Sequence, residues 1–164
     1  MVPIFAKQKV KDSIMTTKKA ITDFLSNRAI AVVGVSRDKK KFGYAVYKHL
    51  KERNYRTFPI NPNVTEIDSD KCYPTLAAVK EKIDGVILVV PPKVSEDVVR
   101  EANDLGIKSI WFQQGSSSDE AVKFCEKHNI GYVKNECIMM FTEPVESIHK
   151  FHRWLWKIFG KLPK

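Results

Sequence analysis

Short apolar runs rich in valine and isoleucine alternate along this chain with longer stretches whose apolar residues recur at helical spacing. The runs predict strands over residues 29–35, 55–59, 84–90, 109–112 and 131–133. The stretches between them predict helices over residues 43–53, 75–82, 95–104 and 118–128. Strands joined by single helices run parallel, because each crossover returns the chain in the same direction. The pattern therefore predicts an α/β fold, a Rossmann-like doubly wound parallel sheet of about five strands.

Amphipathic stretches also flank this alternating region, and they predict helices over residues 13–25 and 144–159. We accordingly divide the chain into an N-terminal basic segment and helix (1–26), a Rossmann-like domain (27–143) and a C-terminal basic aromatic helix (144–164). The last of these is expected to pack on the domain or on a partner.

Turn residues punctuate the pattern at several places. The polar segment 60–73 predicts a loop with a short extended piece at Cys72. Gly106 and Gly131 predict left-handed residues just past helix ends, and Ser117 with Glu120 predicts a capping box.

The composition sets limits on the class of protein. A chain of 164 residues with 43% hydrophobic side chains has room for one domain with a full core. No apolar run approaches the roughly 20 residues that a membrane-spanning helix needs, and the first residues lack the apolar core of a secretion signal. Three cysteines without a CxxC pair fit neither a disulfide framework nor a structural zinc site. We therefore expect a cytoplasmic location.

The net charge of +9 lies at the two ends of the chain. Residues 1–19 carry a net charge of +4 and residues 149–164 a net charge of +5, whereas residues 20–148 hold 18 basic and 18 acidic side chains. A nucleic-acid-binding domain would carry its cations on the fold itself. The distribution therefore argues against nucleic acid as the partner.

The turn after the first predicted strand has the features of a phosphate site. Gly34 ends the strand, Ser36 follows two residues later, and Gly43 opens the next helix. Glycine lets a phosphate approach the backbone, and the start of a helix presents unpaired N–H groups to it. The spacing is not GxGxxG, because Ser36 occupies the second glycine position and the third glycine is displaced to Gly43.

The residues of the turn after the second predicted strand help to distinguish between two classes of nucleotide ligand. A nicotinamide dehydrogenase would place an acid there for the ribose 2′-hydroxyl, whereas this chain has Asn61 and Pro62. Arg37 and the three lysines 39–41 favour a ligand that is richer in phosphate, since cations match phosphate oxygens. The alternative for Lys39 and Lys40 is a solvated surface run.

The third strand ends in Val90, Pro91 and Pro92, which predict a rigid apolar shelf suited to a flat adenine ring. An equally open alternative is a loop that simply ends the strand. The residues after the fourth strand, Gln113, Gln114 and Gly115, can hydrogen-bond amide groups of a ligand, and the alternative there is a turn at the helix entrance.

The ordered set of motifs from about residue 29 to 140 resembles the small stand-alone coenzyme A-binding proteins, whose domain is similar to the coenzyme A-binding domain of the succinyl-CoA synthetase alpha subunit. The segments that carry the resemblance read IAVVGVSRDKKKFG, FPINPNVTEI, CYPTLAAV, DGVILVVPP, WFQQGSSSDEA and NECIMMF. The last differs from the DRCPKIE pattern of many relatives. No room remains for the synthetase domain that supplies a phosphorylated histidine.

The resemblance implies coenzyme A or an acyl-CoA as the ligand of residues 27–143. It implies that the phosphates are lined by Gly34, Val35, Ser36 and Arg37, with Lys41, Phe42 and Gly43 closing the loop. It further implies that Asn61 and Pro62 border the ribose and its 3′-phosphate, and that Val90, Pro91 and Pro92 border the adenine.

Other candidate sites carry weaker signals. His149 and His152 are three residues apart, which is compatible with metal ligation, but no third ligand stands at a clear spacing. The cysteines show no sign of the lowered thiol pKa that a nucleophile needs. The C-terminal segment has an apolar side with two tryptophans and five cations, so the alternatives for it are packing on the domain, a homodimer and peripheral contact with anionic lipid.

Taken as a whole, the sequence predicts binding of coenzyme A or an acyl-CoA without catalysis, in a carrier, sensor or regulatory module. One alternative is an NAD(P)-dependent oxidoreductase on the same fold. Another is an interaction module that acts through residues 144–164.

Overall fold

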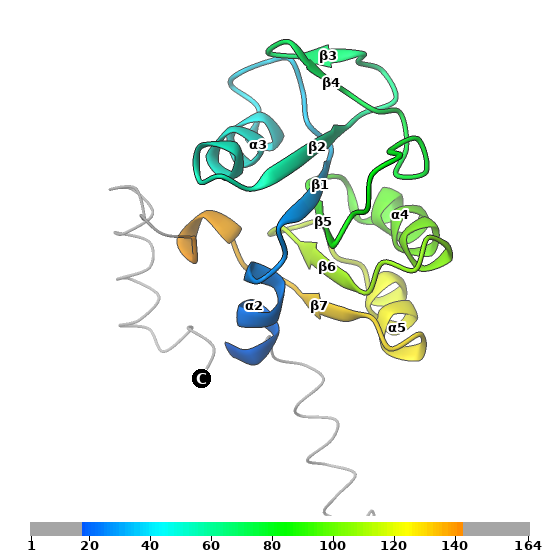
Figure 1. Cartoon of the computed structure of the whole chain (residues 1–164). Coiled ribbons are helices and arrows are strands. Elements are labelled where there is room, and N and C mark those ends of the chain that lie inside the picture. The colour runs from blue at the N-terminus through cyan, green and yellow to red at the C-terminus, as the bar shows by residue number, and fades with distance from the viewer. Residues whose placement is uncertain (1–17, 143–164) are drawn as a thin grey trace, which may run out of the picture.

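A computed structural model of the chain describes residues 18–142, which form a five-stranded sheet in the order β2-β1-β5-β6-β7 (Figure 1). The strands are β1 (Ala29–Val33), β2 (Arg56–Ile60), β5 (Gly85–Leu88), β6 (Ser109–Phe112) and β7 (Gly131–Val133). Every neighbouring pair is parallel. The prediction of a Rossmann-like doubly wound sheet is confirmed.

Helices cover both faces of the sheet (Figure 1). One face carries α2 (Lys18–Leu25), α3 (Phe42–Glu52) and the short 3-10 helix η1 (Ile138–Met140). The other carries α4 (Pro92–Asp104) and α5 (Asp119–Lys127). The chain leaves β1 towards β2 and returns past β1 to β5, so the strand order reverses between β1 and β5. This is the position at which open α/β sheets bind ligands, outside the carboxyl ends of the strands.

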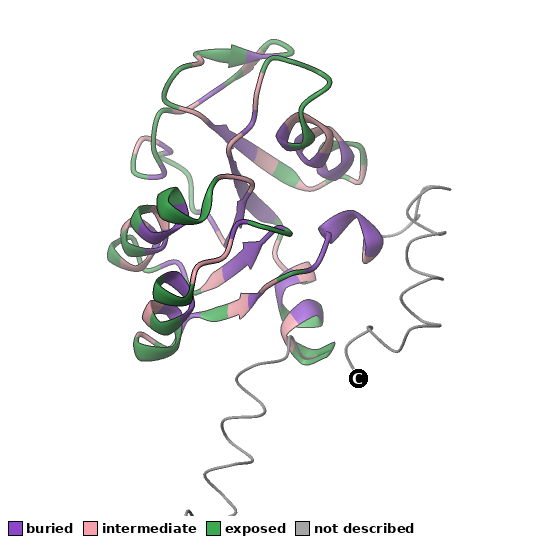
Figure 2. Ribbon diagram, turned by 180° about the vertical axis from the view of Figure 1, so that it is seen from behind, coloured by how far each residue is buried: buried purple, intermediate pink, exposed green. Residues whose placement is uncertain are grey.

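Burial explains why the central strands read as continuous apolar runs. All residues of β1 and β5 are buried, because helices cover both faces. Figure 2 shows the buried strands between helices whose outer faces are exposed. Trp111 of β6 is fully buried beside Phe24 of α2, with the ring centroids 5.3 Å apart in an edge-on arrangement. The core therefore lies in two layers, one on each face of the sheet.

A small antiparallel hairpin follows the edge strand β2. Its strands are β3 (Glu66–Ile67) and β4 (Asp70–Lys71), and the two residues of the turn, Asp68 and Ser69, have φ angles of 50° and 67°. The chain then forms a parallel bridge from Tyr73 to Ile60, on the open side of β2. The predicted loop over 60–73 with an extended piece at Cys72 is thus a hairpin and a bridge next to Cys72.

The predicted helix over residues 75–82 is wrong. The segment contains a single turn, in which Ala78 N–H bonds the Thr75 hydroxyl and Val79 N–H bonds the Leu76 carbonyl. Glu101 of α4 accepts the N–H of Ala77 at 3.0 Å. The apolar residues at helical spacing still enter the core, since a short irregular segment can direct them inward as well as a helix can.

Two predicted helix ends are shifted. Ser118, rather than Ser117, caps α5, and its hydroxyl accepts the N–H of Ala121 at 3.0 Å. Asn129, with φ of 53°, takes the left-handed position after α5 that was predicted for Gly131. Gly106, with φ of 76°, occupies its predicted place after α4. The structure describes α2 from Lys18 onward, and the predicted C-terminal helix lies outside the described residues.

Candidate nucleotide site

Two glycines bring three backbone segments together at the carboxyl ends of β1 and β5. Gly34, directly after β1, has φ of +97°, and a Cβ at this position would lie 2.2 Å from the Val89 carbonyl oxygen. A Cβ at Gly43, in the first turn of α3, would lie 2.2 Å from the Gly34 carbonyl oxygen. Only glycine fits at both positions, because either methyl group would overlap a backbone atom. The structure thus joins the two glycines that the sequence analysis singled out, at the β1–α3 turn (residues 34–41).

Side chains within the β1–α3 turn hold its shape. The Ser36 hydroxyl accepts the N–H of Asp38 at 3.1 Å, and the Asp38 carboxylate accepts the N–H of Lys40 at 2.9 Å. The Ser36 O–H hydrogen remains free to be donated, because this contact uses only a lone pair. The turn exposes its four cationic side chains, which belong to Arg37, Lys39, Lys40 and Lys41.

The helix that follows begins with an open N-terminus. Lys41 is the N-cap residue of α3, its side chain makes no capping hydrogen bond, and the first turn holds no acid. The first N–H groups of a helix have no partner within the helix and carry partial positive charge. Phe42 is 46% exposed beside them, whereas the Val35 side chain is fully buried, so Val35 offers only its backbone to a ligand. The arrangement is suited to an anion.

Asn61, after β2, is tied to the β1–α3 turn. Its side-chain amide donates to the Val35 carbonyl at 2.7 Å, and its side-chain oxygen accepts the N–H of Asn63 at 2.8 Å. Pro62 beside it is exposed. The structure therefore places Asn61 and Pro62 next to the β1–α3 turn, with the Asn61 side chain engaged in positioning the backbone.

The end of β5 presents an apolar surface against the same turn. A Cβ on Gly34 would lie 2.8 Å from Cγ1 of Val90, so the Val90 side chain lies directly against Gly34. Pro91 and Pro92 are exposed at the start of α4. The N–H groups of Val94 and Ser95 both bond the Pro91 carbonyl, and proline itself has no N–H to donate. This β5–α4 turn (residues 89–92) is a rigid surface with few donors.

Gln113 has a different place from the predicted one. It is 1% exposed, its side-chain oxygen accepts the N–H of Ile138 at 2.9 Å, and its amide group contacts the Cys137 sulfur. The side chain therefore holds η1 against the sheet.

The hairpin contributes residues that the sequence analysis missed. Tyr44 of α3 donates its hydroxyl to Asp68 at 2.5 Å, and the Lys39 ammonium of the β1–α3 turn lies 3.7 Å from the same carboxylate. The hydrogen bond to Asp68 raises the pKa of Tyr44 to about 12 and lowers the pKa of Asp68. A hairpin signal was present, since two polar residues that accept positive φ stand between residues 66–67 and 70–71. Its packing on α3 was not visible in the sequence.

The three thiols are buried. Burial raises the pKa of Cys72 and of Cys137, and it raises the pKa of Cys125 to about 12. A thiol in this state is a poor nucleophile, because the thiolate is the reactive form. Within residues 18–142, no group of three His, Cys, Asp or Glu side chains is placed to hold a metal ion. The candidate pair His149 and His152 lies outside the described residues.

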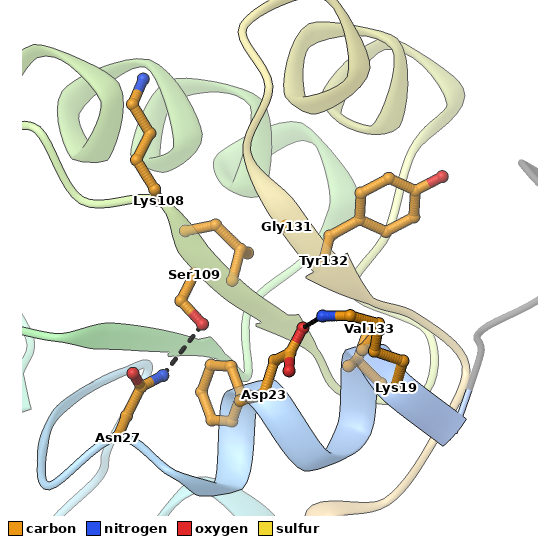
Figure 3. A pocket seen from close by; sticks show the side chains of 11 residues that line it. Lys19, Asp23, Asn27, Lys108, Ser109, Gly131, Tyr132 and Val133 are labelled. Carbon is orange, nitrogen blue, oxygen red and sulfur yellow. Dashed lines mark hydrogen bonds and ion pairs between the residues drawn. The ribbon is translucent and has the colours of Figure 1, made fainter.

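A pocket of about 360 Å³ lies at the opposite edge of the sheet, between α2 and the amino ends of β6 and β7 (Figure 3). Four of its polar side chains bond one another in two pairs. Asn27 donates to the Ser109 hydroxyl at 2.9 Å, and Lys19 pairs with Asp23 at 2.5 Å. This pocket is distinct from the predicted nucleotide site, which lies at the carboxyl ends of the strands.

No helix within residues 18–142 is long and apolar enough to cross a membrane.

Comparisons with known proteins show which family and which relatives this chain is similar to. The family model described as "CoA binding domain" matches residues 28–143. The ADP-forming acetate–CoA ligase of Methanocaldococcus jannaschii is 38% identical over 81 residues, which are 49% of this chain and 12% of the ligase. This chain thus spans only a small part of the curated ligases that it matches.

Two solved structures of stand-alone proteins are similar over most of their length. A conserved hypothetical protein from Pyrococcus furiosus is 39% identical, with a TM-score of 0.68, and the match covers 70% of this chain and 99% of that one. A hypothetical protein from Pyrococcus horikoshii is 31% identical, with a TM-score of 0.75, and the match covers 81% of this chain and 94% of that one.

Proposed function

This chain belongs to the family of CoA-binding domains, and from this premise we propose that it binds coenzyme A or an acyl-CoA at the carboxyl edge of its sheet. In this proposal the protein is a carrier, sensor or regulatory module, and it does not catalyse a reaction alone. The phosphates lie against the β1–α3 turn and the start of α3. The ribose lies towards Asn61 and Pro62, and the adenine lies on Val90, Pro91 and Pro92.

The observation that carries the proposal is the open start of α3 beside four exposed cations. Coenzyme A carries a diphosphate and a 3′-phosphate, so its nucleotide end needs donors and positive charge over a wide area. Unpaired N–H groups at a helix start satisfy the first need, and Arg37 with lysines 39–41 satisfies the second. The apolar β5–α4 turn next to them suits the uncharged adenine.

The non-catalytic role is supported by the chemistry of the described residues. All three thiols are buried with raised pKa values, which disfavours a nucleophilic mechanism. The acetate–CoA ligase from Methanocaldococcus jannaschii matches this chain over 12% of its own length, so a ligase reaction would need parts that lie outside the matched region.

Isothermal titration calorimetry with coenzyme A, dephospho-coenzyme A and NAD tests the proposal. We expect coenzyme A to bind more tightly than dephospho-coenzyme A, because the 3′-phosphate adds charge next to the turn. The double variant Ser36→Ala/Lys41→Ala should weaken binding of coenzyme A by about tenfold, the equivalent of roughly 1.4 kcal/mol. Lys127→Ala, which removes an exposed cation from the far end of α5, is the matched control and should leave binding unchanged.

The outcomes separate the competing functions. Binding of NAD without binding of coenzyme A would favour the oxidoreductase alternative, for which the turn after β2 would normally supply an acid. Binding of none of the three ligands would overturn the nucleotide site altogether.

A further inference from the structure

The β3–β4 hairpin is fastened to α3 by two aspartates in equivalent arrangements. Asp68 accepts the hydroxyl of Tyr44 at 2.5 Å, and the Lys48 ammonium lies 3.8 Å from it. Asp70 accepts hydrogen bonds from Tyr47 and Lys51, each of which lies three residues further along α3 than its counterpart. Each aspartate therefore meets one tyrosine and one lysine of the same helix.

The two aspartates differ in one neighbour. Asp68 also lies 3.7 Å from the ammonium of Lys39, which belongs to the β1–α3 turn, and this ammonium lies 5.9 Å from the centre of the Tyr44 ring. The Lys39 side chain is 73% exposed, so it can leave this position without opening the core. The Asp68 side chain is only 27% exposed and is held by Tyr44. The carboxylate is thus the fixed partner of the pair, and the ammonium is the movable one.

We propose that Asp68 is an internal counter-ion of the phosphate site, which competes with a bound phosphate for Lys39 and thereby sets the affinity for phosphate-rich ligands. The inference rests on the proposed function. A carboxylate and a phosphate both offer anionic oxygens to the same ammonium, so Lys39 must weaken one contact to strengthen the other. Asp68 also lowers the positive potential of the turn, because its charge is fixed within 4 Å of two lysines.

The competition has a consequence for selectivity. The negative charge of Asp68 repels every anionic ligand, and the repulsion grows with the charge that the ligand carries. Removal of this charge should therefore favour coenzyme A more than dephospho-coenzyme A. The effect should also shrink as the salt concentration rises, since both charges lie near solvent.

The test compares Asp68→Asn with Asp70→Asn in titrations with coenzyme A and dephospho-coenzyme A. Asparagine keeps an oxygen that accepts the Tyr44 hydroxyl, and it tolerates the φ of 50° at position 68. We expect Asp68→Asn to tighten coenzyme A binding by about threefold to fivefold, the upper range for an exposed ion pair, with a smaller gain for dephospho-coenzyme A. Asp70→Asn removes the same charge from the same hairpin without a neighbour in the turn, and it should give less than half of that gain.

A double-mutant cycle with Lys39→Gln shows whether the effect passes through Lys39. If the effect passes through Lys39, Asp68→Asn should increase coenzyme A affinity only slightly when Lys39→Gln is already present. An equal gain in both backgrounds, equal gains from the two hairpin variants, or no gain at all would overturn the inference. Wild-type protein that fails to bind coenzyme A would instead overturn the proposed function, and with it this inference. Circular dichroism and thermal unfolding of each variant confirm that the compared proteins are folded.

Discussion

The two turns on either side of the strand reversal differ sharply, although both join a central strand to a helix without a side-chain cap. The β1–α3 turn contains Gly34 and four exposed cations, and its helix starts with free donors. The β5–α4 turn contains Pro91 and Pro92. In both helices the third and fourth N–H groups bond the N-cap carbonyl, from Tyr44 and Ala45 in α3 and from Val94 and Ser95 in α4. The helix starts therefore differ at the first position, where Phe42 has an N–H and Pro92 has none. One turn therefore offers a ligand more positive charge and more donors, and the other offers it an apolar surface.

The third helix at this edge extends the comparison. The start of α5 is filled by its own residues, since Ser118 caps it and Asp119 with Glu120 stands in the first turn. An anion there would meet two acids in place of free donors. In the proposed function, the start of α3 suits an anion because N–H groups and four exposed cations lie together there.

We expect the largest effect from a substitution that disrupts the packing between the β1–α3 turn and α3. Gly43→Ala would place a methyl group 2.2 Å from the Gly34 carbonyl oxygen. In an open helix the same change would stabilise by about 1 kcal/mol, but here overlap with a backbone atom should outweigh that gain and cost about 2 kcal/mol of the free energy of unfolding. Urea unfolding measures the difference.

The control for this prediction is Gly131→Ala, whose methyl group would meet its nearest atom at an ordinary 3.4 Å. Its free energy of unfolding should change by less than about 0.5 kcal/mol. A Gly43→Ala protein as stable as the wild type would show that α3 does not need its close approach to Gly34.

The next effect separates stability from binding within the β1–α3 turn. Lys41→Asp supplies a favoured N-cap to α3 and should raise the free energy of unfolding by about 1 kcal/mol. The same carboxylate would occupy the proposed phosphate position, so calorimetry should show coenzyme A binding weakened by at least about tenfold. Lys127→Asp makes an equal charge reversal at the far end of α5, and this variant should bind coenzyme A as tightly as the wild type. If Lys41→Asp binds coenzyme A as tightly as the wild type, the phosphates do not bind at this turn.

The smallest effect concerns a helix start that the proposal leaves without a ligand. Ser118 accepts the N–H of Ala121 and donates to Glu96, each at 3.0 Å. Ser118→Ala should cost about 1 kcal/mol of stability through the lost cap, with coenzyme A affinity unchanged. Weaker binding in this variant would extend the ligand site to α5.

We also expect the stability of Ser118→Ala to depend on pH differently from that of the wild type. Hydrogen bonds from Lys93 and then from Ser118 lower the pKa of Glu96 in the folded protein. A lowered folded-state pKa gives stability that is present above the ordinary glutamate range and is lost as the pH falls through the folded-state pKa. Ser118→Ala should therefore lose less stability than the wild type between about pH 7 and about pH 3 in urea unfolding, a range that reaches below the ordinary glutamate pKa. An equal loss in both proteins would contradict the prediction.

Local patterns predicted the sheet well because each strand carries its own signal. The runs at β1 and β5 are apolar on both faces, and this is visible without knowing which helices cover them. The segment 75–82 was misread for a related reason. Leu76 and Val79, with Ile83 directly after the segment, repeat at helical spacing and do enter the core. This pattern does not distinguish a helix from an irregular segment that is anchored by Glu101.

Neighbouring residues were enough to predict the order of the strands along the chain, the glycines of the β1–α3 turn and the prolines of the β5–α4 turn. The ordered set of motifs was enough to predict the family. Tertiary structure alone decided which distant groups meet. Tyr44 and Asp68 are 24 residues apart, and Lys39 reaches Asp68 only because the hairpin folds back onto α3. A contact of this kind depends on the paths of two separate segments through space, and no local pattern records those paths.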